Sequence, residues 1–121
     1  MEYATRVKPL TAETEKSVSG IVIHVKSEEH RQKIINNNNI VVVKFGAEWC
    51  GPCKKIEPEY KKLAENKKEI IFLSEDIDDE FEGNYENIKS IPCFHFFKNG
   101  KFKQSCLGAN INKVTEIIKI L

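Results

Sequence analysis

The chain has 121 residues, with 19 Lys and Arg side chains against 18 Asp and Glu, a formal net charge of +1. This length suits one domain with a hydrophobic core, and the balanced charge excludes the strongly basic surface expected of a protein that binds nucleic acid or an anionic membrane. No apolar run approaches the ~20 residues of a membrane-spanning helix.

The first twenty residues are polar and show no hydrophobic period. We expect a flexible N-terminal extension over 1–20 and a single domain over 21–121. The extension does not have the apolar centre of a secretory signal peptide.

The domain opens with a short β-branched run, Ile21–Val25, which predicts a strand. Ser27 then precedes two acidic residues, a pattern typical of a helix N-cap, and predicts a helix that ends at Ile35. The four asparagines of 36–39 predict a turn.

Residues 40–46 are almost entirely apolar and predict a central strand that is covered on both faces. The pattern from about 50 to 66 predicts a helix, and Pro58 inside it should produce a kink. The apolar residues of this helix recur at intervals of three and four: Ile56, Tyr60, Leu63 and Ala64.

The segment Ile70–Leu73 predicts a third strand, and the acidic run over 75–82 predicts a solvated turn followed by the start of a helix. In that helix, Phe81 and Tyr85 would lie one turn apart. The acidic run lacks the alternating ligands and central glycine of a calcium-binding loop.

The C-terminal part contains two strand patterns, 93–97 and 101–107, joined by Asn99-Gly100, a pair typical of a tight hairpin. The pattern over 111–121 predicts a helix whose apolar residues point inward: Val114, Ile117, Ile118 and Leu121. Alternating strands and helices with a terminal hairpin predict an α/β fold, a central mixed sheet flanked by helices.

The motif Trp49-Cys50-Gly51-Pro52-Cys53 follows the apolar strand directly. If a helix begins here, Cys50 lies at its N-terminus, where backbone N–H groups and the helix dipole favour a thiolate over a thiol. Because the thiolate is the form that attacks disulfides, the motif indicates thiol–disulfide exchange.

With these elements in place, the chain from about Ile21 to Leu121 resembles the thioredoxin family. The motifs stand in the family's order: Phe45–Lys54 around the cysteines, Pro58, Asp76-Ile77-Asp78, Ile91-Pro92, Phe96–Gly100 and Gly108-Ala109. The resemblance implies the thioredoxin fold and a protein disulfide reductase that needs no bound cofactor.

The resemblance also implies roles for the motif residues. Cys50 would be the attacking nucleophile and Cys53 the resolving thiol that breaks the mixed disulfide. Gly51 and Pro52 would fix the turn into the helix, because a proline is tolerated in the first helical turn. Trp49, the only tryptophan, would lie as an apolar lid beside the thiols; the family often carries a second tryptophan where this chain has Gly46.

Pro92 resembles the family's cis-proline opposite the active site, although sequence chemistry alone gives cis in only about 5–6% of X–Pro bonds. A cis bond would expose the Ile91 backbone to an extended substrate segment. The expected apolar substrate-binding surface comprises Trp49, Ile91, Pro92, Leu107, Gly108 and Ala109.

Lys44 departs from the family pattern, which usually has a buried acid six residues before the nucleophile. In one interpretation, Lys44 stabilises nearby thiolates and makes the disulfide more oxidising. In the other, its flexible stem carries the ammonium to solvent, or to Glu48 or Glu75, and water moves the proton.

Cys93 is the second departure, because the family usually has Thr after the cis-proline. It is either a third redox thiol close to Cys50 and Cys53 or a small, buried substitute for Thr. We expect Cys106, in the edge strand, to be structural or a site of incidental oxidation. Neither the cysteine spacing nor the three histidines, His24, His30 and His95, fits a metal site.

The sequence therefore predicts a thiol–disulfide oxidoreductase that reduces disulfide-containing proteins and acts as a monomer. The resemblance implies that an NADPH-dependent thioredoxin reductase recharges it. Two alternatives stay open: an oxidase or isomerase of the same fold, and a binding subunit with weak redox turnover. We expect a cytoplasmic location, or an organelle if a targeting segment has been removed. Neither a nucleic acid nor a membrane is expected as a partner.

Overall fold

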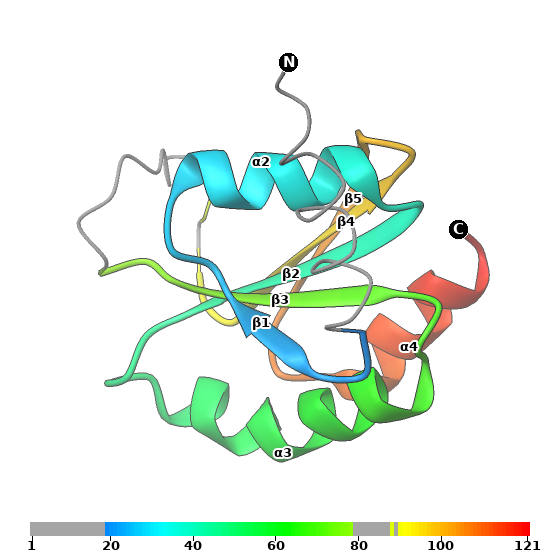
Figure 1. Ribbon diagram of the computed structural model, residues 1–121. Coiled ribbons are helices and arrows are strands. Elements are labelled where there is room, and N and C mark those ends of the chain that lie inside the picture. Colours follow the sequence, from blue (N-terminus) through cyan, green and yellow to red (C-terminus); the bar gives the residue numbers. More distant parts are fainter. Residues whose placement is uncertain (1–18, 79–87, 89) are drawn as a thin grey trace.

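The computed structural model describes residues 19–78, 88 and 90–121 (Figure 1). These residues form a five-stranded sheet and three helices. Residues 1–18 of the predicted N-terminal extension and the predicted helix around Phe81 and Tyr85 lie outside the described residues.

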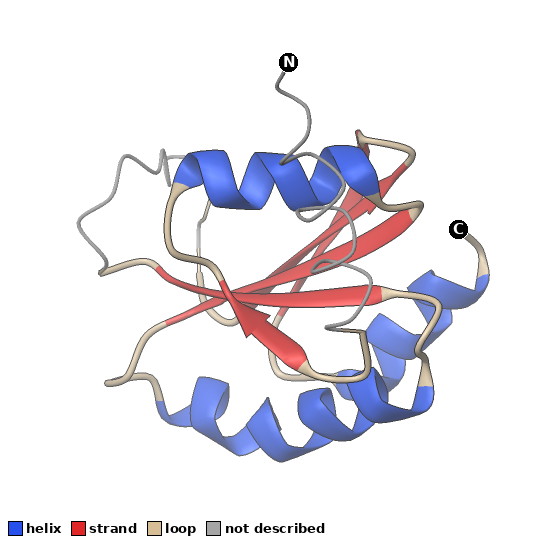
Figure 2. Ribbon diagram, in the orientation of Figure 1, coloured by secondary structure: helices blue, strands red, loops and turns tan. Residues whose placement is uncertain are grey.

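The sheet is mixed, as predicted. Its strands are β1 (Val22–His24), β2 (Ile40–Gly46), β3 (Ile71–Asp76), β4 (Cys93–Lys98) and β5 (Lys101–Leu107), in the spatial order β1-β3-β2-β4-β5 (Figure 2). The three strands β1, β3 and β2 are parallel, and β4 and β5 continue the sheet in antiparallel fashion. The apolar strand β2 is therefore central, as its composition indicates.

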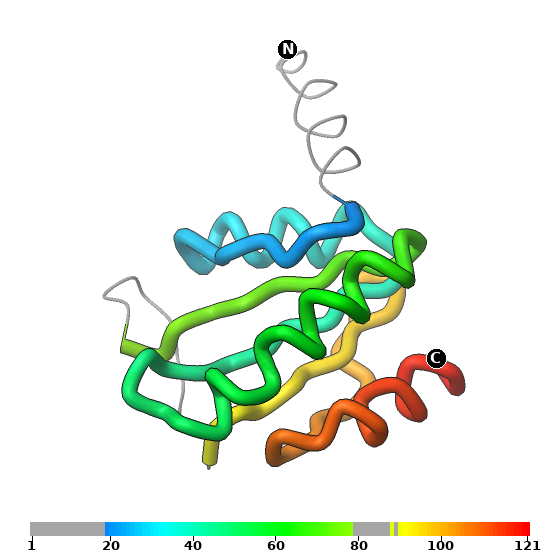
Figure 3. Tube along the Cα trace, turned by 90° about the horizontal axis from the view of Figure 1, so that it is seen from below, coloured from blue at the N-terminus to red at the C-terminus, as the bar shows by residue number. Residues whose placement is uncertain are grey.

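Helices cover both faces of the sheet. Helix α2 (Glu28–Asn37) lies on one face, and α3 (Gly51–Asn66) and α4 (Ile111–Lys119) lie on the other (Figure 1). Figure 3 shows α3 and α4 on the near side of the sheet. This arrangement gives two hydrophobic cores, one on each side of the sheet.

Successive residues of β2 alternate between these cores, as the pleat of a strand requires. Val42 packs toward α3 and α4, in a core that also holds Tyr60 and Val114. Val41 and Val43 pack toward α2 on the opposite face. The inward positions predicted for Ile117 and Ile118 are confirmed in the same way, although α4 ends at Lys119 rather than at the last residue.

The helix boundaries follow local hydrogen bonding. The Ser27 side chain caps α2 by accepting a hydrogen bond from the His30 backbone N–H at 3.0 Å, which confirms the predicted N-cap. The helix runs through Asn37, two residues beyond the predicted end. Asn38 then closes it, its side-chain amide donating to the Ile34 carbonyl at 2.8 Å.

The β4–β5 hairpin turns at Asn99 and Gly100, as predicted. Both residues have positive φ, 53° and 83°. A two-residue turn of this type matches the twist of the flanking strands, and Asn-Gly is the pair that adopts it most readily.

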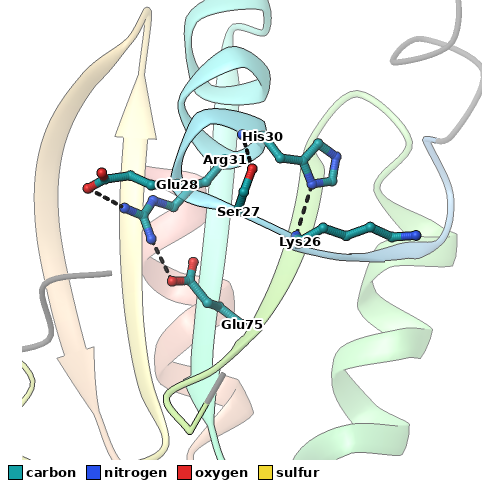
Figure 4. Close-up of polar contacts among 6 residues, drawn as sticks. All are labelled: Lys26, Ser27, Glu28, His30, Arg31 and Glu75. Atoms are coloured by element: carbon teal, nitrogen blue, oxygen red, sulfur yellow. Dashed lines mark hydrogen bonds and ion pairs between the residues drawn. The ribbon is translucent and has the colours of Figure 1, made fainter. Parts of the chain in front are cut away.

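The acidic segment after Leu73 corrects one prediction. Strand β3 continues to Asp76, and Glu75 is 1% exposed rather than part of a solvated turn. Glu75 shares the α2 face with Leu73, and there its carboxylate accepts a hydrogen bond from Arg31 of α2 at 2.6 Å (Figure 4). An arginine on the facing helix thus allows a charged residue to lie inside the sheet.

Candidate active site

The cysteine pair lies where β2 ends and α3 begins. Cys50 is the N-cap of α3, Gly51 is its first residue and Pro52 lies in its first turn, as predicted. Cys50 and Cys53 form a disulfide, with their Cα atoms 5.3 Å apart. The backbone N–H of Cys53 points at the Cys50 sulfur over 3.2 Å, a donor that would stabilise a thiolate once the pair is reduced.

The two cysteines differ little in burial, since Cys50 is 5% and Cys53 4% exposed. Trp49, beside them, is 69% exposed. Its indole N–H donates to the Asp78 carboxylate at 2.6 Å, which holds the ring at this end of the sheet. This partner was not predicted, although Asp78 belongs to one of the motifs that carry the resemblance.

The bond between Ile91 and Pro92 is cis, as the resemblance implies. It places the Ile91 carbonyl oxygen 3.9 Å from the Cys50 sulfur. The Pro92 carbonyl oxygen accepts a hydrogen bond from the backbone N–H of Gly108 at 2.9 Å. The cis-proline thus links the cysteine pair on one side to the end of β5 on the other.

The expected substrate-binding residues therefore gather at one end of the sheet. Leu107 is more than half exposed and pairs with Cys93 at the start of β4. Ile91 is half-buried, Pro92 is buried, and Ala109, which follows Gly108, is exposed. The apolar side chains that face solvent here fit a docking surface, and their role in binding substrate stays a prediction.

Gly46, the last residue of β2, lies directly against Cys53. A Cβ at this position would lie 3.2 Å from the Cys53 sulfur and 3.4 Å from its Cβ. Gly46 therefore allows the close approach of α3 to the strand.

We expect Gly46→Ala to lower the free energy of unfolding of the disulfide form by about 1 kcal/mol, because overpacking forces neighbouring atoms to shift. Urea unfolding measures this change. Gly51→Ala is the matched control, since no atom lies within 4 Å of a Cβ there. An equal decrease in the free energy of unfolding in the two variants would contradict the close approach of α3 to β2 at Gly46.

Lys44 is 4% exposed, so the expectation that its stem carries the charge to solvent is wrong. Its ammonium lies over the Tyr60 ring, 5.6 Å from the ring centre, on the α3 face of the sheet. The expected contact with Glu75 is also wrong, because Glu75 points to the α2 face, where it pairs with Arg31.

Burial lowers the pKa of Lys44, and the Glu57 carboxylate of α3 acts in the opposite direction. Glu57 follows Cys53 by four residues, the spacing that places two side chains on one helix face. That spacing could have identified Glu57 as a neighbour of the site from the sequence.

Cys93 and Cys106 are free and buried. Cys93 packs in the core beneath α2, and Cys106 packs in the core beneath α3 and α4, so the sheet separates their side chains. Burial raises the pKa of both thiols. These positions favour a structural role for Cys93, as a small residue in place of Thr.

We expect Cys93 to be inert in a chain that carries Cys50→Ser and Cys53→Ser. Because the protonated, buried thiol is a poor nucleophile, thiol counting with a maleimide should detect no fast-reacting group in the folded protein and two after denaturation. Fast labelling of Cys93 in the folded variant would instead support a third redox thiol.

The histidines have packing and capping roles. The ring of His95 contacts that of Phe45 edge-on, with centroids 4.8 Å apart, and burial lowers its pKa. His30 accepts a hydrogen bond from the Lys26 backbone N–H (Figure 4). Within the described part of the chain, no group of three His, Cys, Asp or Glu side chains could hold a metal ion.

In the described ranges, no helix has both the length and the apolar character needed to cross a membrane. The exposed lysines of α3, such as Lys54 and Lys61, lie on the solvent face of that helix, as predicted.

A cysteine pair at a helix N-terminus, facing a cis-proline at the end of a mixed sheet, defines a thiol–disulfide oxidoreductase. Comparison with known proteins agrees. The thioredoxin family model matches residues 21–120. The chain belongs to the thioredoxin family.

Relatives of known name support this assignment. Thioredoxin 1 of Plasmodium falciparum is 38% identical over 96 residues, which cover 78% of this chain and 92% of the relative. Thioredoxin of Gallus gallus is 42% identical over 83 residues, which cover 68% of this chain and 79% of the relative. The crystal structure of thioredoxin f from spinach chloroplast matches with a TM-score of 0.82 at 28% identity, over 89% of this chain and 92% of that chain.

Proposed function

We propose that this chain reduces disulfide bonds in protein substrates, with Cys50 as the nucleophile and Cys53 as the resolving thiol. The observation that carries the proposal is the position of Cys50 at the α3 N-terminus, with its sulfur 3.9 Å from the carbonyl oxygen of Ile91, the residue before the cis-proline. The chain's thioredoxin homologues support dithiol–disulfide reductase activity, and Cys50 and Cys53 are at disulfide distance.

In the first step, the Cys50 thiolate attacks one sulfur of the substrate disulfide. A mixed disulfide forms, and the second substrate sulfur leaves with the electron pair and takes up a proton. In the second step, the Cys53 thiolate attacks the Cys50 sulfur, and the first substrate sulfur leaves in the same way. The substrate gains two electrons and two protons, and the chain ends with the disulfide seen in the structure.

The apolar surface around Trp49 and Leu107 would hold an extended substrate segment during these steps. The Ile91 backbone, which lies beside the Cys50 sulfur, would pair with that segment in the manner of strand addition. The two cysteines alone would carry the electrons, so the exchange needs no bound redox group.

A thioredoxin reductase would restore the dithiol, and we propose an NADPH-dependent enzyme of this class. A solved structure similar to this chain, with a TM-score of 0.78 at 27% identity, is that of a complex of ferredoxin:thioredoxin reductase and thioredoxin f2. It supports a reductase as partner. The chain would act as a monomer in the cytoplasm, where reducing conditions would keep Cys93 and Cys106 as thiols.

The reduction potential of the cysteine pair tests the direction of electron flow. Equilibration against a glutathione series, followed by Trp49 fluorescence, should give a value near the ~−270 mV typical of thioredoxin. A value more than ~50 mV higher would favour the oxidase or isomerase alternative. Reduction of the pair by NADPH and a purified NADPH-dependent reductase tests the electron donor, and imaging of a tagged full-length chain tests its location.

A further inference from the structure

Lys44 and the resolving cysteine face the same side of the sheet. Residues two apart on a strand share a face, so the Lys44 side chain points toward α3 on the same face on which Gly46 borders that helix. Their Cα atoms are about 7 Å apart along β2. Gly46 is also the residue against which the Cys53 sulfur packs. The Lys44 stem therefore leaves β2 on the face where the Cys53 sulfur packs, two residues before Gly46, and carries the buried ammonium group to the Tyr60 ring.

A cavity of about 420 Å³ joins the two side chains, since both Lys44 and Cys53 line it. Water in such a space could take a proton from the Cys53 thiol. The other ionisable groups that line the cavity come from every neighbouring element: His24 of β1, Glu75 and Asp76 of β3, Glu48 of the loop before α3, and Lys54 and Glu57 of α3.

Two of these acids are already engaged elsewhere. The Glu75 carboxylate pairs with Arg31 on the other face, and the Asp76 carboxylate accepts a hydrogen bond from the Asp78 backbone N–H at 2.8 Å. Glu57 acts on Lys44 directly, because its charge offsets part of the cost of burying an ammonium group, while the positive charge of Lys61 adds to that cost.

We propose that Lys44 is a positioning residue that holds Cys53 as a thiolate in the mixed disulfide, so that a buried cation prepares the resolving step in this chain. The proposal rests on the exchange chemistry given above. Cys53 loses its proton to water in the cavity, and its thiolate attacks the Cys50 sulfur. The bond from Cys50 to the substrate sulfur breaks, and that sulfur leaves with the electron pair and is protonated by water.

Two measurable quantities follow from a cation beside a thiolate. An opposite charge within a few ångströms lowers a thiol pKa by about one unit or more, which is a tenfold change in the thiolate fraction. The same interaction stabilises the reduced form relative to the disulfide, and it fades as the pH rises through the pKa of Lys44.

Lys44→Met tests the proposal in the Cys50→Ser chain. The Cys53 pKa, measured from thiolate ultraviolet absorbance with the Cys50→Ser, Cys53→Ser chain as blank, should rise by about one unit. In the chain with both cysteines, Lys44→Met should change the equilibrium constant with glutathione about tenfold in favour of the disulfide. This corresponds to a reduction potential of the cysteine pair that is about 30 mV lower.

The matched variants separate charge from packing. Lys44→Arg keeps the charge and should retain the low pKa of Cys53. Lys62→Met removes an exposed α3 charge that neither lines the cavity nor is among the charges acting on Lys44, and it should leave the Cys53 pKa unchanged. If Lys44→Met does not fold, Lys44→Gln provides the same comparison with a polar side chain. An unchanged or lower Cys53 pKa in the neutral variants would overturn the proposal.

These measurements also separate this proposal from the proposed function. The thiol titration and the glutathione equilibrium need no protein substrate, so failure to reduce protein disulfides would refute the proposed function alone. A normal reductase activity with no change in the Cys53 pKa would refute only the role of Lys44.

Discussion

Cys53→Ser is expected to leave the chain joined covalently to its substrate. Cys50 would still attack from the α3 N-terminus, where the backbone N–H of residue 53 faces its sulfur. The introduced serine hydroxyl cannot resolve the mixed disulfide, because only a thiolate attacks it at a useful rate. Incubation with an oxidised protein substrate should give about one equivalent of adduct, stable on a non-reducing gel and lost on addition of dithiothreitol, and no further turnover.

Cys50→Ser is the control for this experiment, and it should form no adduct, because Cys53 lies inside the first turn of α3 and not at the N-cap, where the backbone N–H of residue 53 faces an attacking thiolate. Mass spectrometry of the Cys53→Ser adduct should place the substrate on Cys50. An adduct on Cys93 would contradict the assignment of roles. A Cys50→Ser chain that kept its biological role would favour the binding-subunit alternative.

The fold was predictable from the sequence because its elements carry strong local patterns. The β-branched run of β2, the Asn99-Gly100 turn and the Ser27 cap all fold as local chemistry dictates. The cis bond at Pro92 was predictable only from the family resemblance, since most X–Pro bonds are trans.

The environment of each charged side chain was less predictable. Lys44 was expected to reach water, Glu48 or Glu75, and Glu75 was expected in a solvated turn, yet Lys44 and Glu75 are buried on opposite faces of the sheet. The error has a physical origin: composition indicates that an acidic run is solvated, whereas the alternation of β3 after Leu73 places every second residue in a core. Counting that alternation through Glu75 would have found the buried carboxylate. Its partner, Arg31, lies 44 residues away and becomes evident only in the fold.

Arg31→Met is expected to lower the free energy of unfolding by about 3 kcal/mol, the size typical of removing one partner from a buried ion pair. The Glu75 side chain is fully buried and that of Arg31 is mostly buried, with 2.6 Å between guanidinium nitrogen and carboxylate oxygen (Figure 4). Because Met retains much of the apolar stem of Arg31, the decrease in the free energy of unfolding measures mainly the loss of the guanidinium charge. Urea unfolding at neutral pH, with the linear extrapolation, measures it.

A double variant decides whether the charge itself is responsible. Arg31→Met with Glu75→Leu removes both charges and should recover most of the lost stability, because apolar residues often replace a buried ion pair without cost. Glu28→Gln removes only the exposed ion pair of Arg31 with Glu28, at 3.5 Å. It should lower the free energy of unfolding by less than about 0.5 kcal/mol. A loss below about 1 kcal/mol for Arg31→Met alone would mean that the apolar side chains of α2, led by Ile34 and Ile35, hold this helix on the sheet without the ion pair.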